Sequence, residues 1–196
     1  MKKGDCTRLR IIDEATRQAS ARGLGGISLA DVAAPAGISK SGLFKHFDSK
    51  EAMQQAVLAS SFDRFLGYVW APVSDQPAGR PRLEAVFERW LTWGHVECAA
   101  SGCPITAMAT ELDDQPGPLR EYLRGRILSW RKHIVADFKA LRCPAASDAE
   151  AWQAVFEMKA FILGYNEASR LLEDPKALTH TRAAFAHLLD RIAGKA

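Results

Sequence analysis

A short run of small and basic residues carries hydrogen-bond donors at helical spacing. Ser39, Lys40 and Ser41 are consecutive, and Lys45 follows four residues after Ser41. Serine hydroxyls and lysine ammonium groups can donate to phosphate oxygens and to base edges. Gly42, in the same run, lets a backbone approach a duplex closely. These residue types indicate contact with nucleic acid.

The residues around this run predict two short helices separated by a tight turn. Ser28 is an expected N-cap with Asp31 three residues later, and Ser39 is the expected N-cap of a helix that continues to about Phe47. Gly37 lies between them and can adopt a positive φ without steric cost. Two helices joined in this way form a helix-turn-helix, whose second helix enters the major groove of DNA.

The spacing of apolar residues separates an inner from an outer face of this segment. Those expected to pack in a small core with the first helix are Val32, Ala33, Ala36, Ile38, Leu43 and Phe47. Those expected on the outer surface are Lys40, Ser41, Gly42, Phe44, Lys45 and His46. The plainer alternative is a three-helix packing module with solvated lysines, which accounts less well for the whole ordered set with both caps.

The charge distribution favours the same segment. Residues 1–51 contain nine Lys or Arg against six Asp or Glu, an excess of +3. The remaining residues contain seventeen of each sign, so the whole net charge of +3 lies in the first quarter of the chain. A basic segment followed by a neutral remainder indicates a polyanionic partner for the first part.

Together these residues resemble the DNA-binding domain of TetR-family transcriptional regulators. The resemblance covers residues 7–56 and rests on Ser28, Ala-Gly-Ile-Ser at 36–39, Lys-Ser-Gly-Leu-Phe at 40–44, His46-Phe47 and Ser49-Lys50-Glu51. Gly-Cys-Pro at 102–104 and Pro-Gly-Pro-Leu-Arg at 116–120 are similar to patterns in some members. The resemblance implies a DNA-binding domain at 1–50 and a ligand-binding and dimerisation domain at 51–196.

The resemblance also implies roles for individual residues. Ser28 would cap the second helix and touch a phosphate, and Lys50 would reach a phosphate from the start of the fourth helix. Near base edges and backbone, at the start of the recognition helix, it places Ser39, Lys40, Ser41 and Gly42. Lys45 and His46 would contact phosphate or bases, and Phe44 is a further DNA-binding candidate. Phe44 and His46 stand where the family often has Tyr, so hydroxyl contacts to phosphate are missing there.

The remainder of the chain also has helical periodicity, which predicts an all-α fold of nine helices with short connections. The expected helices include a short second one that begins after Ser28 and has Pro35 in its last turn, and a long fourth one from about 51 to 68 or 70. The others cover 7–22, 39–47, 82–99, 104–112, 118–142, 148–173 and 175–193, and residues 71–81 are expected to form a loop. No run of apolar residues is long enough to cross a membrane.

The last two helices carry more apolar surface than one core contact uses. A helix that is apolar on two faces is central or lies at an interface. The resemblance favours a homodimer interface, which would present two recognition helices to half-sites about 34 Å apart. The predicted interface residues are Phe161, Gly164, Ala168, Leu171, Phe185, Leu188, Leu189 and Ile192.

The resemblance further implies a pocket for an unknown small-molecule effector in the body of the chain. Large side chains that could line it are common there, although an aromatic at helical spacing more often belongs to a core. The candidate lining residues are Trp90, Trp93, His95, Met108, Trp130, Trp152, Phe156 and Tyr165.

Other chemistries find little support. The histidines are scattered, and we expect no catalytic constellation, metal cluster or cofactor. Cys103 precedes Pro104 at an expected helix start and follows Cys98 by five residues, so a redox-responsive regulator is an alternative. A small-molecule-binding enzyme with a vestigial helix-turn-helix is a weaker one. Four cysteines without a CxxC pair and the absence of a secretion signal favour the cytoplasm.

Overall fold

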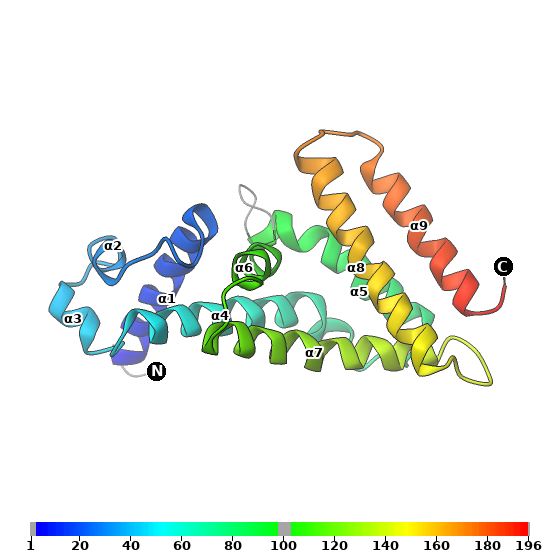
Figure 1. Cartoon of the computed structure of the whole chain (residues 1–196), viewed down its shortest axis with the longest axis horizontal. Coiled ribbons are helices and arrows are strands. Elements are labelled where there is room, and N and C mark those ends of the chain that lie inside the picture. Colours follow the sequence, from blue (N-terminus) through cyan, green and yellow to red (C-terminus); the bar gives the residue numbers. More distant parts are fainter. Residues whose placement is uncertain (1–2, 98–102, 196) are drawn as a thin grey trace. The chain divides into compact units, whose positions relative to one another are not determined.

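The computed structural model describes residues 3–97 and 103–195, and in these residues it contains nine α-helices, one short 3-10 helix and no strand. This confirms the predicted all-α class (Figure 1). The helices are α1 (Lys3–Arg22), α2 (Leu29–Ala33), α3 (Lys40–Phe44), α4 (Lys50–Val69), α5 (Arg80–Glu97), α6 (Pro104–Leu112), α7 (Pro118–Lys139), α8 (Asp148–Arg170) and α9 (Ala177–Ile192), with the 3-10 helix at Ala71–Val73.

The helices form two compact units. The first comprises Met1–Leu66 with Gly94–Arg126, and the second comprises Gly67–Trp93 with Ile127–Ala196. Helices α4, α5 and α7 each begin in one unit and end in the other. Most of α4 and all of α6 therefore share a compact unit with the N-terminal helices, and a functional boundary near residue 50 stays a prediction.

The core of the first unit joins α1 to the helix-turn-helix. Of the six residues predicted to form this core, Ile38 is half-buried. The others are buried, as predicted: Val32, Ala33, Ala36, Leu43 and Phe47. They pack with buried residues of α1 and of the following loop, among them Ile11, Ala15, Leu24 and Ile27. Removing this apolar surface from water is what holds five-residue helices in place, since helices so short are not stable alone.

In the second unit, α8 and α9 lie side by side as an antiparallel pair (Figure 1). Phe185 of α9 stacks on Phe87 of α5, with ring centroids 3.8 Å apart. A buried ion pair joins α5 to α7, because Arg82 donates to the carboxylate of Asp137, which is 0% exposed. Arg82 also donates to the carbonyl oxygens of Ser74 and Gln76, which anchors the connection before α5.

Several helix ends differ from the predicted ones. Helix α8 ends at Arg170 instead of 173, and Glu173 then adopts a positive φ of 52°. Helix α9 begins at Ala177 instead of 175, because the Asp174 carboxylate accepts the N–H of Lys176 in a local turn. Helix α7 ends at Lys139, three residues early, and α1 begins at Lys3, four residues early.

Candidate nucleic-acid interface

Helix α3 is short and is capped at its start. The Ser39 hydroxyl accepts the N–H of Gly42 at 3.0 Å and lies 3.1 Å from the hydroxyl of Ser41. The helix ends at Phe44 instead of the predicted Phe47, because the next N–H groups bond back to Gly42 and Leu43 in a closing turn. Before α3, Gly37 has a φ of 69°, the left-handed conformation that the sharp turn was predicted to need.

The side chains predicted to contact DNA lie at or near the surface of this segment. The exposed ones are Ser39, Lys40, Ser41, Phe44, Lys45 and Lys50, and the half-buried ones are Ser28, Gly42 and His46. Lys45 and His46 follow α3 instead of lying within it. Their contacts with bases or phosphates stay predictions.

Two arginines of α1, which the sequence did not single out, hold α3 and the turn before it. The Arg8 guanidinium lies 4.2 Å from the ring centroid of Phe47 and donates to the carbonyl oxygen of His46. Arg10 donates to the carbonyl oxygen of Ala36 at 2.5 Å. The sequence does not distinguish these arginines from other solvated basic residues, because the residues that they bond are 26 and 38 positions away.

Helix α2 is tied to α1 by a buried amide. Gln18, only 7% exposed, donates to the carbonyl oxygen of Asp31 at 2.9 Å and to the carboxylate of Glu14. The Arg17 guanidinium bonded to Glu14 lowers the pKa of that carboxyl, so the acceptor stays ionised. The Ser28 hydroxyl caps α2 and donates to the Asp31 carboxylate at 2.6 Å. A phosphate contact by Ser28 would therefore require that hydroxyl to turn away from Asp31.

Lys50 and Gln54 of α4 hold the loop between α1 and α2. The Lys50 ammonium donates to the carbonyl oxygen of Gly25 at 2.7 Å, and the buried Gln54 amide donates to that of Leu24 at 2.8 Å. The N–H groups of Leu24 and Gly25 are bonded from α6: Glu111 accepts both of them, each at 2.5 Å. The candidate phosphate contact Lys50 is thus bonded to a loop that α4 and α6 hold in place.

Comparison with known proteins decides the family. The family model described as tetracyclin repressor-like, C-terminal domain, matches residues 79–185, more than half of the chain. The model of bacterial regulatory proteins of the tetR family matches residues 11–57, which contain α2 and α3. The chain belongs to the TetR family.

Individual relatives agree with this assignment. The chain is 34% identical over 79 residues to the HTH-type transcriptional repressor KstR2 of Rhodococcus jostii, a match that spans 40% of this chain and 39% of that protein. A TetR regulator from Chloroflexus aurantiacus is 25% identical, with a TM-score of 0.78 and coverage of 98% and 96%. A TetR-family regulator from Streptomyces coelicolor shares the fold at 18% identity, with a TM-score of 0.81 and coverage of 95% and 90%.

The effector-pocket residues predicted for this TetR-family chain do not all come together. Trp90, Trp93 and Trp130 are buried in the second unit, where Trp90 and Trp130 meet edge to face at 4.7 Å and Lys159 lies over Trp90. Tyr165 is half-buried on α8. The side chain of His95 is outside the described part of the chain.

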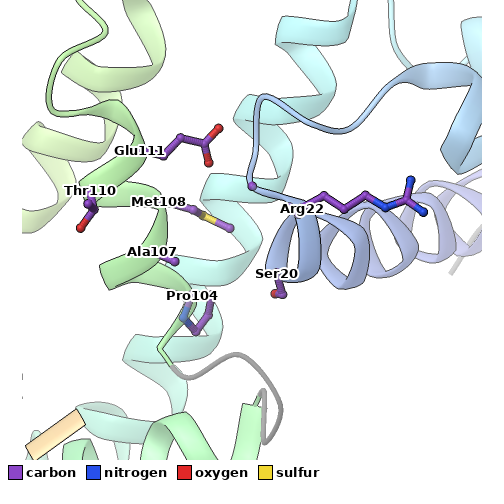
Figure 2. Close-up of a pocket in the computed structure, with 9 residues that line it drawn as sticks. Ser20, Arg22, Pro104, Ala107, Met108, Thr110 and Glu111 are labelled. Atoms are coloured by element: carbon purple, nitrogen blue, oxygen red, sulfur yellow. The ribbon is translucent and has the colours of Figure 1, made fainter. Parts of the chain in front are cut away.

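Three of these residues lie elsewhere than predicted. Trp152 and Phe156 are 38% and 66% exposed on α8, so they do not line an interior cavity of the single chain. Met108 belongs to the first unit, where it lines a pocket of ≈ 450 Å³ between the end of α1 and α6 (Figure 2). Four other residues of that pocket are Arg22, Gly23, Pro104 and Glu111.

The predicted dimer interface of this TetR-family chain is also partly wrong. Four of its residues on α9 are at most 4% exposed in the single chain, and a side chain already removed from water adds almost no area to an interface. These core residues are Phe185, Leu188, Leu189 and Ile192. The residues predicted on and just after α8 remain accessible: Gly164 and Leu171 are exposed, and Phe161 and Ala168 are half-buried.

Helix α8 instead presents an apolar stripe that the single chain does not cover. We call this set the α8 stripe: Trp152, Phe156, Ala160, Leu163, Gly164 and Leu171. Trp152, Phe156, Ala160 and Leu163 follow one another at intervals of four, four and three residues and so share one face of the helix, with Gly164 beside them. Leu171, the C-cap residue, comes seven residues after Gly164 and continues the same face just beyond the end of α8. Phe156 and Leu171 are 66% and 74% exposed, although large apolar side chains are usually buried. A group of such side chains on a protein surface indicates an interaction site.

The remaining predictions concern redox, metal and membrane chemistry. Cys103 is half-buried at the N-cap of α6, and Cys98 lies outside the described residues, so a redox response stays a prediction. In the described residues no three His, Cys, Asp or Glu side chains gather as a metal site. None of the helices described is both long and apolar enough to span a bilayer.

Proposed function

We propose that this chain is a transcriptional repressor that binds a palindromic operator as a homodimer and is released by a small molecule. The observation that carries DNA binding is the capped helix α3, with Lys40 and Ser41 exposed at its first turn. Donors at the start of a recognition helix are the ones that reach base edges in the major groove. Repression is the activity printed for the relative from Rhodococcus jostii, of which this chain matches 39%.

The α8 stripe supports dimerisation. Large exposed apolar side chains along a long surface helix favour a partner, and the small residues Ala160 and Gly164 permit close approach of another helix. A twofold axis would place the same stripe on both sides of the interface and would pair two α3 helices with two half-sites. The proposed interface therefore consists of the α8 stripe with Phe161 and Ala168, without the four buried residues of α9.

Effector control is proposed from the family and from one further neighbour in fold. The structure of AibR, 19% identical with a TM-score of 0.67, is a complex with isovaleryl coenzyme A and operator DNA. For this chain we propose a small-molecule effector that prefers the conformation with lower operator affinity, since a ligand shifts an equilibrium by its differential affinity alone. The proposed effector region is the buried pair of Trp90 and Trp130, with Trp93 buried on the same helix as Trp90. We propose no catalytic role, and the cytoplasm as the place of action.

The DNA-binding proposal is tested by selecting bound fragments from random duplex DNA at low salt. A palindromic site with half-sites one helical turn apart is expected, and fluorescence anisotropy on that site should give salt-dependent binding. Recovery of no enriched sequence, or of one with no symmetry, would contradict the proposal of a homodimeric sequence-specific regulator.

The dimer is tested by Phe156→Glu, which places a charge in the centre of the α8 stripe. Sedimentation should change from dimer to monomer, and operator affinity should fall with it. Leu128→Glu places the same charge on α7, at another partly exposed apolar position, and should leave the dimer intact. A Phe156→Glu protein that remains dimeric would assign the interface elsewhere.

A further inference from the structure

Two consecutive residues between α1 and α2 are bonded by side chains at all four of their backbone polar groups. Glu111 Oε2 accepts the N–H of Leu24, and Glu111 Oε1 accepts the N–H of Gly25. Gln54 donates to the carbonyl oxygen of Leu24, and Lys50 donates to that of Gly25. Side chains thus supply the hydrogen bonds that regular secondary structure would otherwise provide to these two residues: one carboxylate from α6 accepts, and two groups from α4 donate.

In this clamp, both backbone polar groups of Gly25 are bonded to ionised side chains. The Gly25 residue donates to an anionic oxygen at 2.5 Å and accepts from the Lys50 ammonium at 2.7 Å. Hydrogen bonds with one ionised partner are stronger than neutral ones. The N–H and the carbonyl of Gly25 belong to successive peptide groups, so Glu111 acts on the ammonium of Lys50 by fixing the position of the Gly25 residue and not by direct contact.

Two glycines of this loop, Gly23 and Gly25, lie against Glu111. A Cβ on Gly25 would lie 3.0 Å from Glu111 Oε1, although the φ of Gly25 is not in the left-handed region. A Cβ on Gly23 would lie 3.0 Å from Glu111 Oε2, and this residue also needs its positive φ of 81°. Glycine at position 25 therefore serves the close approach of a carboxylate and not the path of the chain, and a Cβ there would displace the end of the Glu111 side chain by a few tenths of an ångström.

Glu111 is also accessible from outside the core. It lines the pocket between the end of α1 and α6, together with Arg22 and Gly23. Figure 2 shows its side chain projecting from α6 toward the loop that follows Arg22. The carboxylate can consequently be altered without opening the apolar core of the unit.

We propose that Glu111 is a positioning residue for operator binding: its carboxylate fixes Leu24 and Gly25, and through Gly25 it holds the Lys50 ammonium where a phosphate is bound. The inference rests on the proposed function, because it assigns Glu111 a part in DNA binding. A carboxylate on α6 thus sets the geometry of a phosphate contact on α4 without touching DNA.

The test compares Glu111→Gln with Asp114→Asn in the full-length protein, on the operator recovered by selection. Asp114 is exposed in the turn after α6, so its variant removes the same charge nearby. We expect Glu111→Gln to weaken binding about tenfold and Asp114→Asn to change it less than about twofold. Amide exchange at Leu24 and Gly25 should accelerate in Glu111→Gln alone, a measurement that needs no DNA.

A double-mutant cycle separates positioning from general destabilisation. If Glu111 acts through Lys50, then Glu111→Gln adds little to the loss caused by Lys50→Ala. Losses that add in full would overturn the route through Lys50. Gly25→Ala tests the same contact from the loop. It should weaken operator binding in the native chain but cause no further loss of affinity in a Glu111→Ala protein, where the new Cβ has room.

The outcomes distinguish this inference from the proposed function. If the native protein and Asp114→Asn bind the operator and Glu111→Gln binds equally well, the inference is overturned and the function stands. If the native protein binds no duplex at low salt, the function is overturned, and with it the role of the clamp in operator binding. Unchanged amide exchange in a folded Glu111→Gln protein contradicts the clamp itself.

Discussion

The ammonium of Lys50 lies 2.7 Å from the carbonyl oxygen of Gly25, so the first residue of α4 is bonded to the loop that precedes α2. An ammonium group has three donors, and one bond to a carbonyl leaves two for a phosphate. The lysine is exposed, and its position is already fixed before DNA arrives. Fixing a long side chain in advance lowers the entropy lost on binding.

Lys50→Ala is expected to weaken operator binding to a similar extent across operator sequences, because a phosphate contact carries no base information. The slope of log K against log salt should become shallower by about 0.9 for each half-site. Anisotropy titrations at four or more salt concentrations measure this slope. Lys176→Ala, in the exposed turn before α9, is the matched control and should leave the slope unchanged.

A salt slope in Lys50→Ala equal to that of the native protein would exclude the phosphate contact. Lys50→Arg keeps the charge and should retain most of the slope.

Lys40 and Ser41, at the start of α3, are expected to set base preference instead. Replacing either by Ala should relax discrimination at one or two positions of each half-site, by about 1–3 kcal/mol for a well-formed base contact. Competition assays against a panel of single-base operator variants measure it. Lys50→Ala provides the contrast, since its losses should be uniform across the panel; uniform losses for Lys40→Ala as well would make Lys40 another phosphate contact.

The accuracy of the sequence-based predictions follows the range of the interactions. The caps at Ser28 and Ser39 and the turn at Gly37 depend on residues within four positions, and the structure confirms all of them. The clamp by Glu111 joins residues 86 and 87 positions apart, and no local pattern marks it.

Periodicity likewise identifies an apolar face without identifying what covers it. The stripe of α9 was predicted to face a second copy, but Phe185 stacks on Phe87 of the same chain. The equally apolar face of α8 is the one left uncovered. A helix that packs on its own chain and a helix that packs on a partner carry the same pattern, so the choice between them needs the tertiary structure.

The buried pair of Arg82 and Asp137 makes a prediction about stability. Arg82→Met should lower the free energy of unfolding by about 3–5 kcal/mol, because it leaves a carboxylate buried without its partner. Urea unfolding at fixed protein concentration measures the change. Arg182→Met removes an exposed pair with Glu88 and should cost less than about 1 kcal/mol.

Adding Asp137→Leu to Arg82→Met should recover much of the lost stability, since no charge then remains buried. A double variant less stable than Arg82→Met would mean that Asp137 has a stabilising role independent of the arginine.

Glu150 makes the stability of the second unit depend on acid. It is the N3 residue of α8, and bonds from the N–H and hydroxyl of Ser147, followed by the bond from Arg142, lower its pKa from 4.5 to about 2. A carboxyl whose pKa is lower in the folded chain stabilises the fold above its unfolded pKa and loses that effect as the pH falls toward its folded pKa. Its contribution is thus complete above about pH 5 and disappears between about pH 4.5 and pH 2.

Glu150→Gln should accordingly be less stable than the native protein at pH 6, and the difference should shrink as the pH falls toward 2.5. Thermal unfolding at pH 6, 4 and 2.5 measures this convergence. Asp114→Asn changes an exposed acid far from Ser147 and Glu150, and its unfolding temperature should differ from that of the native protein by the same amount at all three pH values. A Glu150→Gln deficit that stays constant from pH 6 to 2.5 would assign its effect to lost packing or hydrogen-bond geometry instead of to the ionised carboxylate.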